Sequence, residues 1–290
     1  MATLFLVSTP IGNLRDLSPR AADTLRAASR ILAEDTRRSR ILADHVGATA
    51  PLVSLHAHNE RERVDAILSW LDDGDDLVLV SDAGTPLVSD PGGRVVSAVV
   101  EAGHDVVPVP GPSAVLAALA ASGLSADRFT FLGFPARKGA ARAADLERIA
   151  ESAETVVLFE SPNRLERLLE DLQAICGPDR PVAVARELTK MHEEFVRGTL
   201  SEVARYYGER PPRGEVTLVV APAPEGDPSD ALGPEARRLA EALLGAGVKP
   251  SAAARELARR LDLARNEAYR IVHELRDAGA ASTGNATTEE

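Results

Sequence analysis

SDAGTPLVSDPG, residues 81–92, directly follows the apolar run DLVLV at residues 76–80. The run predicts a buried strand, and the two glycines and two prolines after it predict a tight, stiff loop. Glycine lets a backbone approach a bound molecule closely, and the Asp, Ser and Thr side chains supply hydrogen-bonding groups. Open α/β sheets bind ligands at the carboxyl ends of their strands, so we expect this loop to line a ligand site.

The length of 290 residues exceeds that of one typical domain and predicts two domains with a small appendage. The hydrophobic fraction is 44%, but no apolar run approaches the roughly 20 residues of a membrane helix. The start MATLFLVSTP lacks the basic region of an export signal. The lone cysteine, Cys176, excludes an internal disulfide and a cysteine-based zinc cage. We therefore expect a cytoplasmic protein without membrane contact.

The net charge of −11 argues against long-range attraction to naked nucleic acid, although it allows a local basic face. Basic residues cluster at Arg37, Arg38 and Arg40, and again at Arg137, Lys138 and Arg142. Residues 233–277 carry nine Lys/Arg against seven Asp/Glu. Each cluster is either a solvated face or a contact for phosphate groups.

Short β-branched runs alternate with amphipathic helical stretches along the first 221 residues. The predicted strands are 3–7, 77–80, 105–109, 129–132, 155–159, 181–185 and 216–221, and the predicted helices include 19–28, 60–71, 93–102, 114–121 and 164–175. This alternation predicts an α/β protein with parallel or mixed sheets, in two lobes that divide near residues 109–112.

The proline-rich segment 222–234 has no apolar periodicity and predicts an extended linker. Helical patterns follow at 235–244, 251–261 and 265–275 and resemble a helix-turn-helix. We expect an N-terminal α/β lobe (1–110), a C-terminal α/β lobe that completes a ligand cleft (111–222), a linker (223–234), a helical module (235–277) and a disordered tail (278–290).

Two further loops occupy ligand-binding positions. STPIGN, residues 8–13, follows the first predicted strand and contains Pro10, but its single glycine does not match the GxGxxG dinucleotide fingerprint, and the chain contains no P-loop. GPSAV, residues 111–115, lacks the second glycine of a nucleophile elbow, so we expect Ser113 to start a helix and line a pocket.

Polar residues suggest three other sites. His56 and His58 have the spacing of two metal ligands on one strand face, but no third ligand is evident, and hydrogen bonding at a pocket rim is the alternative. The segment ARELTKMHEEFVR, residues 185–197, is dense in charges that either transfer protons or form structural ion pairs. Glu160 ends another predicted strand, with Arg164 close behind it.

Several motifs in the right order strongly resemble the tetrapyrrole-methylase superfamily. They span about residues 4–221 and read STPIGNL, LAEDTRRSRILADHVG, SLHAHNE, VSDAGTPLVSDPG, VPVPGPSAVLAALAASGL, FLGFPARKG, FESPNRL and VARELTKMHEEFVRGTL. Tetrapyrrole methylases usually carry GxGxGD after the first strand, where this chain has STPIGN. This departure favours the RNA-methylating branch of the superfamily.

That resemblance implies a two-lobed, usually dimeric enzyme that binds S-adenosylmethionine between its lobes. The implied reaction is methylation of the ribose 2′-oxygen of a cytidine in the decoding region of 16S rRNA, within the assembled small ribosomal subunit. Docking on a structured particle is compatible with an acidic enzyme, because shape as well as phosphate attraction guides recognition of folded RNA. No metal is implied.

The resemblance also implies which residues contact the cofactor. With Pro10 from the first loop, the expected set is Pro10, Gly84, Thr85, Val88, Ser113, Ala114, Phe159, Glu160, Ala185, Arg186 and Thr217. In the RNA branch a histidine commonly follows the proline of the ESP motif, but this chain has Asn163 there. A base at that position is therefore not expected.

Methyl transfer from a sulfonium is an in-line displacement that depends mainly on positioning the acceptor oxygen. The hydroxyl must also lose a proton, and we expect Glu187, Lys190 or His192 to act as a base or to stabilise the developing alkoxide. We expect Arg37, Arg38, Arg137 and Lys138 to contact RNA phosphates.

Two other functions fit parts of the sequence. One is methylation of a tetrapyrrole carbon with the same cofactor, against which the missing GxGxGD and the added basic module argue. The other is a nucleic-acid-binding regulator in which the α/β lobes sense a ligand and the helices after residue 233 bind DNA.

Overall fold

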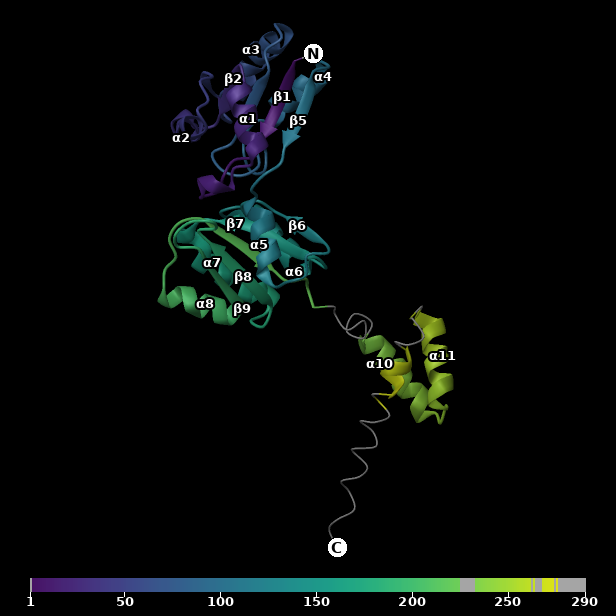
Figure 1. The fold of residues 1–290 in the computed structure, drawn as a ribbon. Helices are drawn as coiled ribbons and strands as arrows, with labels where there is room; N and C mark the ends of the chain where they lie inside the picture. The colour runs from purple at the N-terminus through teal and green to yellow at the C-terminus, as the bar shows by residue number, and fades with distance from the viewer. Residues whose placement is uncertain (1, 225–232, 262, 264–267, 274, 276–290) are drawn as a thin grey trace. The chain divides into compact units, whose positions relative to one another are not determined.

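The computed structural model describes residues 2–224, 233–261, 263, 268–273 and 275. It divides into two compact units, residues 1–222 and residues 223–290. The predicted α/β class is confirmed, because the first unit contains two separate five-stranded sheets covered by helices (Figure 1). We call these sheets with their helices the N-lobe and the C-lobe.

The N-lobe sheet is entirely parallel, with the strand order β3-β2-β4-β1-β5. Its strands are β1 (Thr3–Val7), β2 (Arg30–Ala33), β3 (Leu52–Ser54), β4 (Leu77–Val80) and β5 (Asp105–Val109). Every residue of β4 is buried, as expected for a central strand covered on both faces.

Helices cover both faces of this sheet (Figure 1). They are α1 (Pro19–Ala27), α2 (Thr36–Val46), α3 (Glu60–Asp72) and α4 (Gly93–Glu101), and a short 3-10 helix, η1 (Leu14–Asp16), precedes α1. Leu25 and Val46 of α1 and α2 pack on one face with Val78, whereas Ile67 and Val99 of α3 and α4 pack on the other face. The lobe is therefore doubly wound.

Helix α4 begins at the end of the loop 81–92, and a side chain from another helix caps it. Oε1 of the buried Glu60 on α3 accepts hydrogen bonds from the backbone N–H groups of Arg94 (2.6 Å) and Val95 (3.3 Å). A carboxylate at a helix N-terminus satisfies free N–H groups and interacts favourably with the helix dipole. This contact anchors the carboxyl end of the loop.

The C-lobe sheet is mixed, with the order β6-β7-β10-β8-β9. Its strands are β6 (Phe129–Phe131), β7 (Thr155–Glu160), β8 (Pro181–Arg186), β9 (Glu194–Thr199) and β10 (Val216–Val220). Only the β6 and β7 pair is parallel, and the other neighbours are antiparallel. The sequence pattern did not single out β9, which is a polar strand at the edge of the sheet.

The two faces of the C-lobe sheet carry different helices, which are α5 (Ala114–Ser122), α6 (Gly139–Glu151), α7 (Pro162–Cys176) and α8 (Leu200–Glu209). Alternate residues of β10 divide between the faces, since Leu218 packs with α7 and α8 and Val219 packs with α5. Ile11 of the N-lobe joins the α5 cluster, so the two lobes share apolar contacts.

The second unit has its own apolar core. Helices α10 (Gly233–Gly245) and α11 (Pro250–Leu261) pack together with the helical residues 268–273 through Ala240, Leu257 and Ile271. The expected linker lies mostly outside the described residues, as does part of the expected helix 265–275, and the tail 278–290 lies entirely outside them. Within the described part of the chain, no helix has the length and apolarity needed to cross a membrane.

We expect the leucine side chains that α7 buries in the core to contribute strongly to the stability of the C-lobe. Leu169 is fully buried, whereas Ile175 on the same helix is 43% exposed. L169A should lower the free energy of unfolding by about 2 to 5 kcal/mol, because it removes apolar burial and leaves a cavity. I175A should cost less than about 1 kcal/mol. Urea unfolding followed by circular dichroism measures both, and equal losses would contradict this packing.

Candidate active site

The loops that follow β1 and β4 contact each other at the point where the chain crosses to opposite faces of the N-lobe sheet. β1 and β4 are neighbours, yet α1 after β1 and α4 after β4 lie on opposite faces of the sheet. A ligand crevice forms at such a switch point. The loops are joined by reciprocal backbone hydrogen bonds, from Thr9 N to Gly84 O at 2.8 Å and from Gly84 N to Thr9 O at 3.1 Å.

The loop 81–92 holds an unusual backbone. Gly84 and Gly92 have φ values of 81° and 121°, and the non-glycine residues Leu87 and Ser89 also have positive φ, at 74° and 69°. A Cβ on Gly92 would lie 2.7 Å from Leu87 Cδ2 and 3.1 Å from Leu79 Cδ1. Positive φ in side-chain-bearing residues is strained and is concentrated at functional sites.

A cavity of about 350 Å³ lies between the two lobes. Its lining comes from the loop 81–92, the start of α5, the end of β7 and the start of β10. The lining residues are Ile11, Ala83, Gly84, Thr85, Val88, Ser89, Asp90, Ser113, Ala114, Val115, Phe134, Phe159, Glu160, Ser161, Pro162, Gly214, Glu215, Val216 and Thr217. This volume and the largely apolar lining with a few polar groups are typical of a small-molecule site.

Glu160 is the most buried acidic group of the cavity lining. Its Oε1 accepts hydrogen bonds from Ser161 N at 2.7 Å and from Arg164 Nε at 2.6 Å. Its Oε2 is buried and has no hydrogen-bond partner among the described residues. A buried acceptor without a partner carries a desolvation cost, which a ligand hydroxyl or amino group would remove.

Asp90 lies among carboxylates at the N-lobe side of the cavity. Burial raises its pKa to about 6, assisted by the negative charges of Glu34 and Asp82, while a hydrogen bond from Ser81 partly opposes this shift. Burial and Asp82 likewise raise the pKa of Glu34. Neighbouring carboxylates thus add to the effect of burial on both groups.

The C-lobe loop after β8 carries a network of charges. Lys190 Nζ lies 2.7 Å from Glu187 Oε1 and 3.0 Å from Glu215 Oε2, and Glu215 N donates to Glu187 Oε1 at 3.0 Å. The hydrogen bond from Lys190 lowers the pKa of Glu187. Burial opposes the charge of Lys190, but its bonds to the two carboxylates outweigh burial and raise its pKa. Both side chains are therefore charged at neutral pH.

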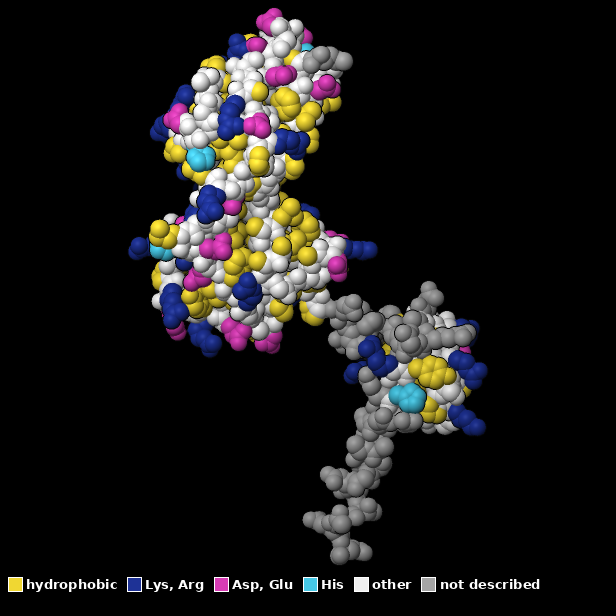
Figure 2. Space-filling view, viewed as in Figure 1, with side chains coloured by type: hydrophobic (Ala, Val, Ile, Leu, Met, Phe, Trp, Pro, Cys, Tyr) yellow, Lys and Arg dark blue, Asp and Glu magenta, His cyan; other side chains and the backbone are white. Residues whose placement is uncertain are grey.

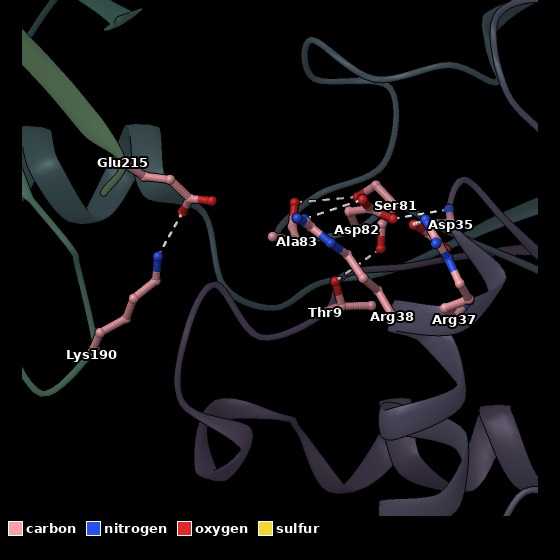
Figure 3. Close-up of polar contacts among 9 residues, drawn as sticks. All are labelled: Thr9, Asp35, Arg37, Arg38, Ser81, Asp82, Ala83, Lys190 and Glu215. Carbon is pink, nitrogen blue, oxygen red and sulfur yellow. Dashed lines mark hydrogen bonds and ion pairs between the residues drawn. The ribbon is translucent and has the colours of Figure 1, made fainter. Parts of the chain in front are cut away.

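Glu187, Lys190 and His192, the three residues expected to be catalytic, do not line the cavity. Lys190 reaches the cavity through Glu215, which is a lining residue (Figure 3). His192 is exposed on the same loop. Gly12 of the N-lobe lies against this loop, because a Cβ there would clash with Lys190 Cγ. The charged loop thus contacts the loop after β1.

The structure places most of the expected cofactor residues around the cavity. Those that line it are Gly84, Thr85, Val88, Ser113, Ala114, Phe159, Glu160 and Thr217. Pro10 lines a separate small cavity, Ala185 is buried in the α5 cluster, and Arg186 bonds Glu194 at 3.0 Å. Ser113 also caps α5, as expected, by accepting a hydrogen bond from Leu116 N at 3.4 Å.

The four basic residues expected to contact phosphate groups differ in whether an acidic side chain is paired with them. Arg37 and Arg38 lie in the first turn of α2, where Arg37 Nη2 is 2.7 Å from Asp35 Oδ2 and Arg38 Nη1 is 3.3 Å from Asp82 Oδ2 (Figure 3). These acidic partners weaken the attraction of both arginines for a phosphate group.

Arg137 and Lys138 are exposed just before α6. Neither side chain has a hydrogen bond or ion pair within the part of the chain that the structure describes. The preceding loop contacts the cavity region, since a Cβ on Gly133 would lie 3.2 Å from Ser89 Oγ. Positive and negative side chains are interspersed over both lobes on the visible face of the molecule (Figure 2).

His56 and His58 follow β3, with their rings 5.9 Å apart and edge-on. Nδ1 of His56 is buried without a described hydrogen-bond partner, and His58 is exposed. No group of three His, Cys, Asp or Glu side chains among the described residues could hold a metal ion.

Sequence reasoning did not identify several lining residues. Asp90 lies in the SDPG end of the first quoted loop, and Phe134 lies in the FLGFPARKG motif, so both were inside recognised motifs but were not assigned. Gly214 and Glu215 lie just before β10, close to the expected Thr217, but were not assigned, and the antiparallel pairing of β10 with β7 and β8 brings them to the cavity.

Two solved methyltransferases have a similar fold. The methyltransferase CobJ matches with a TM-score of 0.59 and 21% identity, covering 77% of this chain and 95% of CobJ. Uroporphyrin-III C-methyltransferase from Thermus thermophilus, complexed with S-adenyl homocysteine, matches with a TM-score of 0.56 and 22% identity, covering 76% of this chain and 97% of that structure. At these identities the likeness concerns the fold alone.

Sequence relatives are closer. "Ribosomal RNA small subunit methyltransferase I" of Synechocystis sp. is 45% identical over 279 residues, covering 95% of this chain and 99% of the relative. The protein of the same name from Mycobacterium bovis is 49% identical over 222 residues, covering 76% of this chain and 78% of that relative. The family model of the tetrapyrrole (corrin/porphyrin) methylases matches residues 3–204. The chain therefore belongs to the tetrapyrrole (corrin/porphyrin) methylase family and, within it, to the group of proteins named ribosomal RNA small subunit methyltransferase I.

Proposed function

We propose that this protein transfers a methyl group from S-adenosylmethionine to the ribose 2′-oxygen of a cytidine in 16S rRNA. The observation that carries the proposal is the similarity, over almost the whole chain, to proteins named for methylating small-subunit ribosomal RNA. The cavity of about 350 Å³ between the lobes supports the proposal, because it has the size of a small-molecule site.

The cavity suits S-adenosylmethionine chemically. The cofactor carries a positive sulfonium and an amino group, and the acidic side chains of Glu160 and Glu215 line the C-lobe side of the cavity. Glu160 Oε2 is a buried acceptor that needs a donor, and the apolar wall that includes Phe134 and Phe159 suits a nucleoside ring. When bound, the cofactor supplies an electrophilic methyl group.

The protein's own contribution is to position the acceptor and to complement charge. The strained loop 81–92 and the start of α5 form one wall of the cavity, and β7 with β10 forms the opposite wall. The ammonium of Lys190, fixed by Glu187 and Glu215, contributes positive charge near the mouth of the cavity. We assign Lys190 to stabilising an alkoxide that develops on the acceptor, with Glu187 as its positioning residue.

RNA docking uses Arg137 and Lys138 more than Arg37 and Arg38, because only the latter pair have acidic partners in the described structure. We further propose that the enzyme is a cytoplasmic homodimer that acts on the assembled small subunit. The net charge of −11 favours a structured particle over naked RNA as substrate. Size-exclusion chromatography with light scattering tests the dimer.

The first test is transfer of a labelled methyl group from S-adenosylmethionine to small subunits purified from a strain lacking this protein. Nucleoside analysis should reveal 2′-O-methylcytidine, and naked 16S rRNA should be a poorer acceptor. If the protein binds the cofactor but labels no RNA, the RNA proposal is wrong, and a tetrapyrrole would be the next substrate to test.

Lys190→Met should slow single-turnover methyl transfer by about 10- to 100-fold, because it removes a fixed positive charge beside the reacting oxygen. The affinity for S-adenosylmethionine, measured by calorimetry, should change little. Lys249→Met in the second unit is the matched control and should retain the wild-type rate. An unchanged rate in K190M would exclude this role.

The double variant R137A/K138A should weaken subunit binding and reduce the slope of log affinity against log salt by about 1 to 2, since each phosphate contact releases counterions. R148A/R205A removes two exposed arginines from α6 and α8 and serves as the charge-matched control. Filter binding between about 50 and 200 mM salt measures both slopes. Identical slopes for the two double variants would refute the assignment.

A further inference from the structure

The acidic side chains that line the cavity differ in their partners. Glu160 is ion-paired with Arg164, and Glu215 is ion-paired with Lys190 and has a side chain that is 69% exposed. No Lys, Arg or His among the described residues forms an ion pair with Asp90. Asp90 is therefore the cavity carboxylate whose charge no described cation balances.

The groups that face Asp90 are themselves acidic or neutral. Glu34 approaches from the end of β2, while Asp82 and Ser81 approach from the end of β4. Arg38, a cation beside this cluster, is paired with Asp82 at 3.3 Å. Such surroundings repel a phosphate and attract the hydroxyl or amino group of a nucleoside, which donates hydrogen bonds to carboxylates.

The other ionisable groups near the cavity are less suited to accept a proton. Lys190 is held as an ammonium, and the pKa of Glu187 is lowered by its bond to Lys190. Burial and the neighbouring carboxylates instead raise the pKa of Asp90 to about 6, closer to the pH at which a general base is most effective.

We propose that Asp90 is the general base that accepts the proton of the ribose 2′-hydroxyl during methyl transfer. This inference rests on the proposed function and adds a catalytic residue to it. As the 2′-oxygen forms its bond to the methyl carbon, the methyl–sulfur bond breaks and its electron pair stays on sulfur. The hydroxyl proton moves to a carboxylate oxygen of Asp90.

The test compares D90N and D90E with wild type in single-turnover methyl transfer to small subunits across pH 5 to 8. The wild-type rate should rise with pH through about 6, because only the carboxylate accepts a proton. D90N should lose about 100-fold or more in rate and also lose that rise. D90E should retain part of the rate together with a pH-dependent rise. Asp105→Asn, at the exposed start of β5, should behave as wild type.

Two measurements without catalysis separate this role from a structural one. S-adenosylmethionine affinity should stay within about threefold in D90N, since the base contacts the acceptor. The folded state favours protonated Asp90, so the carboxyl contributes stability at low pH that is lost as the pH rises through about 6. D90N should therefore melt above wild type at pH 8, and this difference should shrink towards pH 4.

Each contrary outcome has a distinct meaning. A normal rate in D90N, or a lost rate with equally lost cofactor binding, would overturn the assignment of Asp90. If D90N does not fold, a D90E variant that folds but is inactive and lacks the pH-dependent rise would also overturn it. Absence of 2′-O-methylcytidine with the wild-type protein would overturn the proposed function itself, and the inference with it.

Discussion

The pair of backbone hydrogen bonds between Thr9 and Gly84 is the contact on which the site depends. It joins the loops after β1 and β4, which leave the sheet towards opposite faces. Thr85 Oγ1 then donates to Pro112 O at 3.3 Å, which connects the same loop to the segment that leads into the C-lobe. A few backbone groups thus fix one wall of the cavity and the chain segment that connects the lobes. Hydrogen bonds between backbone groups depend little on side-chain identity.

The strained backbone around this contact is supported from outside the cavity. Glu60 caps the helix that ends the loop, and Gly92 fits where any Cβ would clash with Leu87. The loop 187–190 on the opposite side is strained as well, with φ of 52° at Glu187 and 64° at Thr189. These four non-glycine positive-φ positions of the described residues lie in two loops beside the same cavity, which is consistent with preorganisation of a binding site.

Acidic side chains line the cavity, and two exposed basic side chains lie outside it. Carboxylates gather where a cationic cofactor and a hydroxyl-bearing nucleoside fit, whereas the exposed Arg137 and Lys138 lie outside the cavity. The acidic interior makes the cavity less attractive to phosphate groups, so under the proposed function the RNA backbone would be held outside it. The protein can therefore be acidic overall and still act on RNA.

The α/β class, the strands with β-branched runs and several loops that line the cavity can be predicted from the amino-acid sequence alone. Apolar runs such as 77–80 and 216–221 are clear because buried strands need them. The edge strand β9 was missed because its exposure permits the polar residues EFVRGT. Among the expected site residues, Gly84, Ser113 and Thr217 reach the cavity, since a glycine turn, a helix cap and strand alternation are local properties.

Which charged residues line the cavity and which pair with each other depends on how the chain folds. Arg186 does not line the cavity and is paired with Glu194. Lys190 is paired with Glu187 and Glu215. Asp90 lines the cavity and forms no ion pair with a described cation. These outcomes depend on contacts between residues that are distant in the sequence, such as Lys190 with Glu215 and Asp90 with Glu34. The pKa of a carboxyl depends on its burial and its neighbours in space. Sequence spacing therefore located the candidate loops, and folding determined the charges within them.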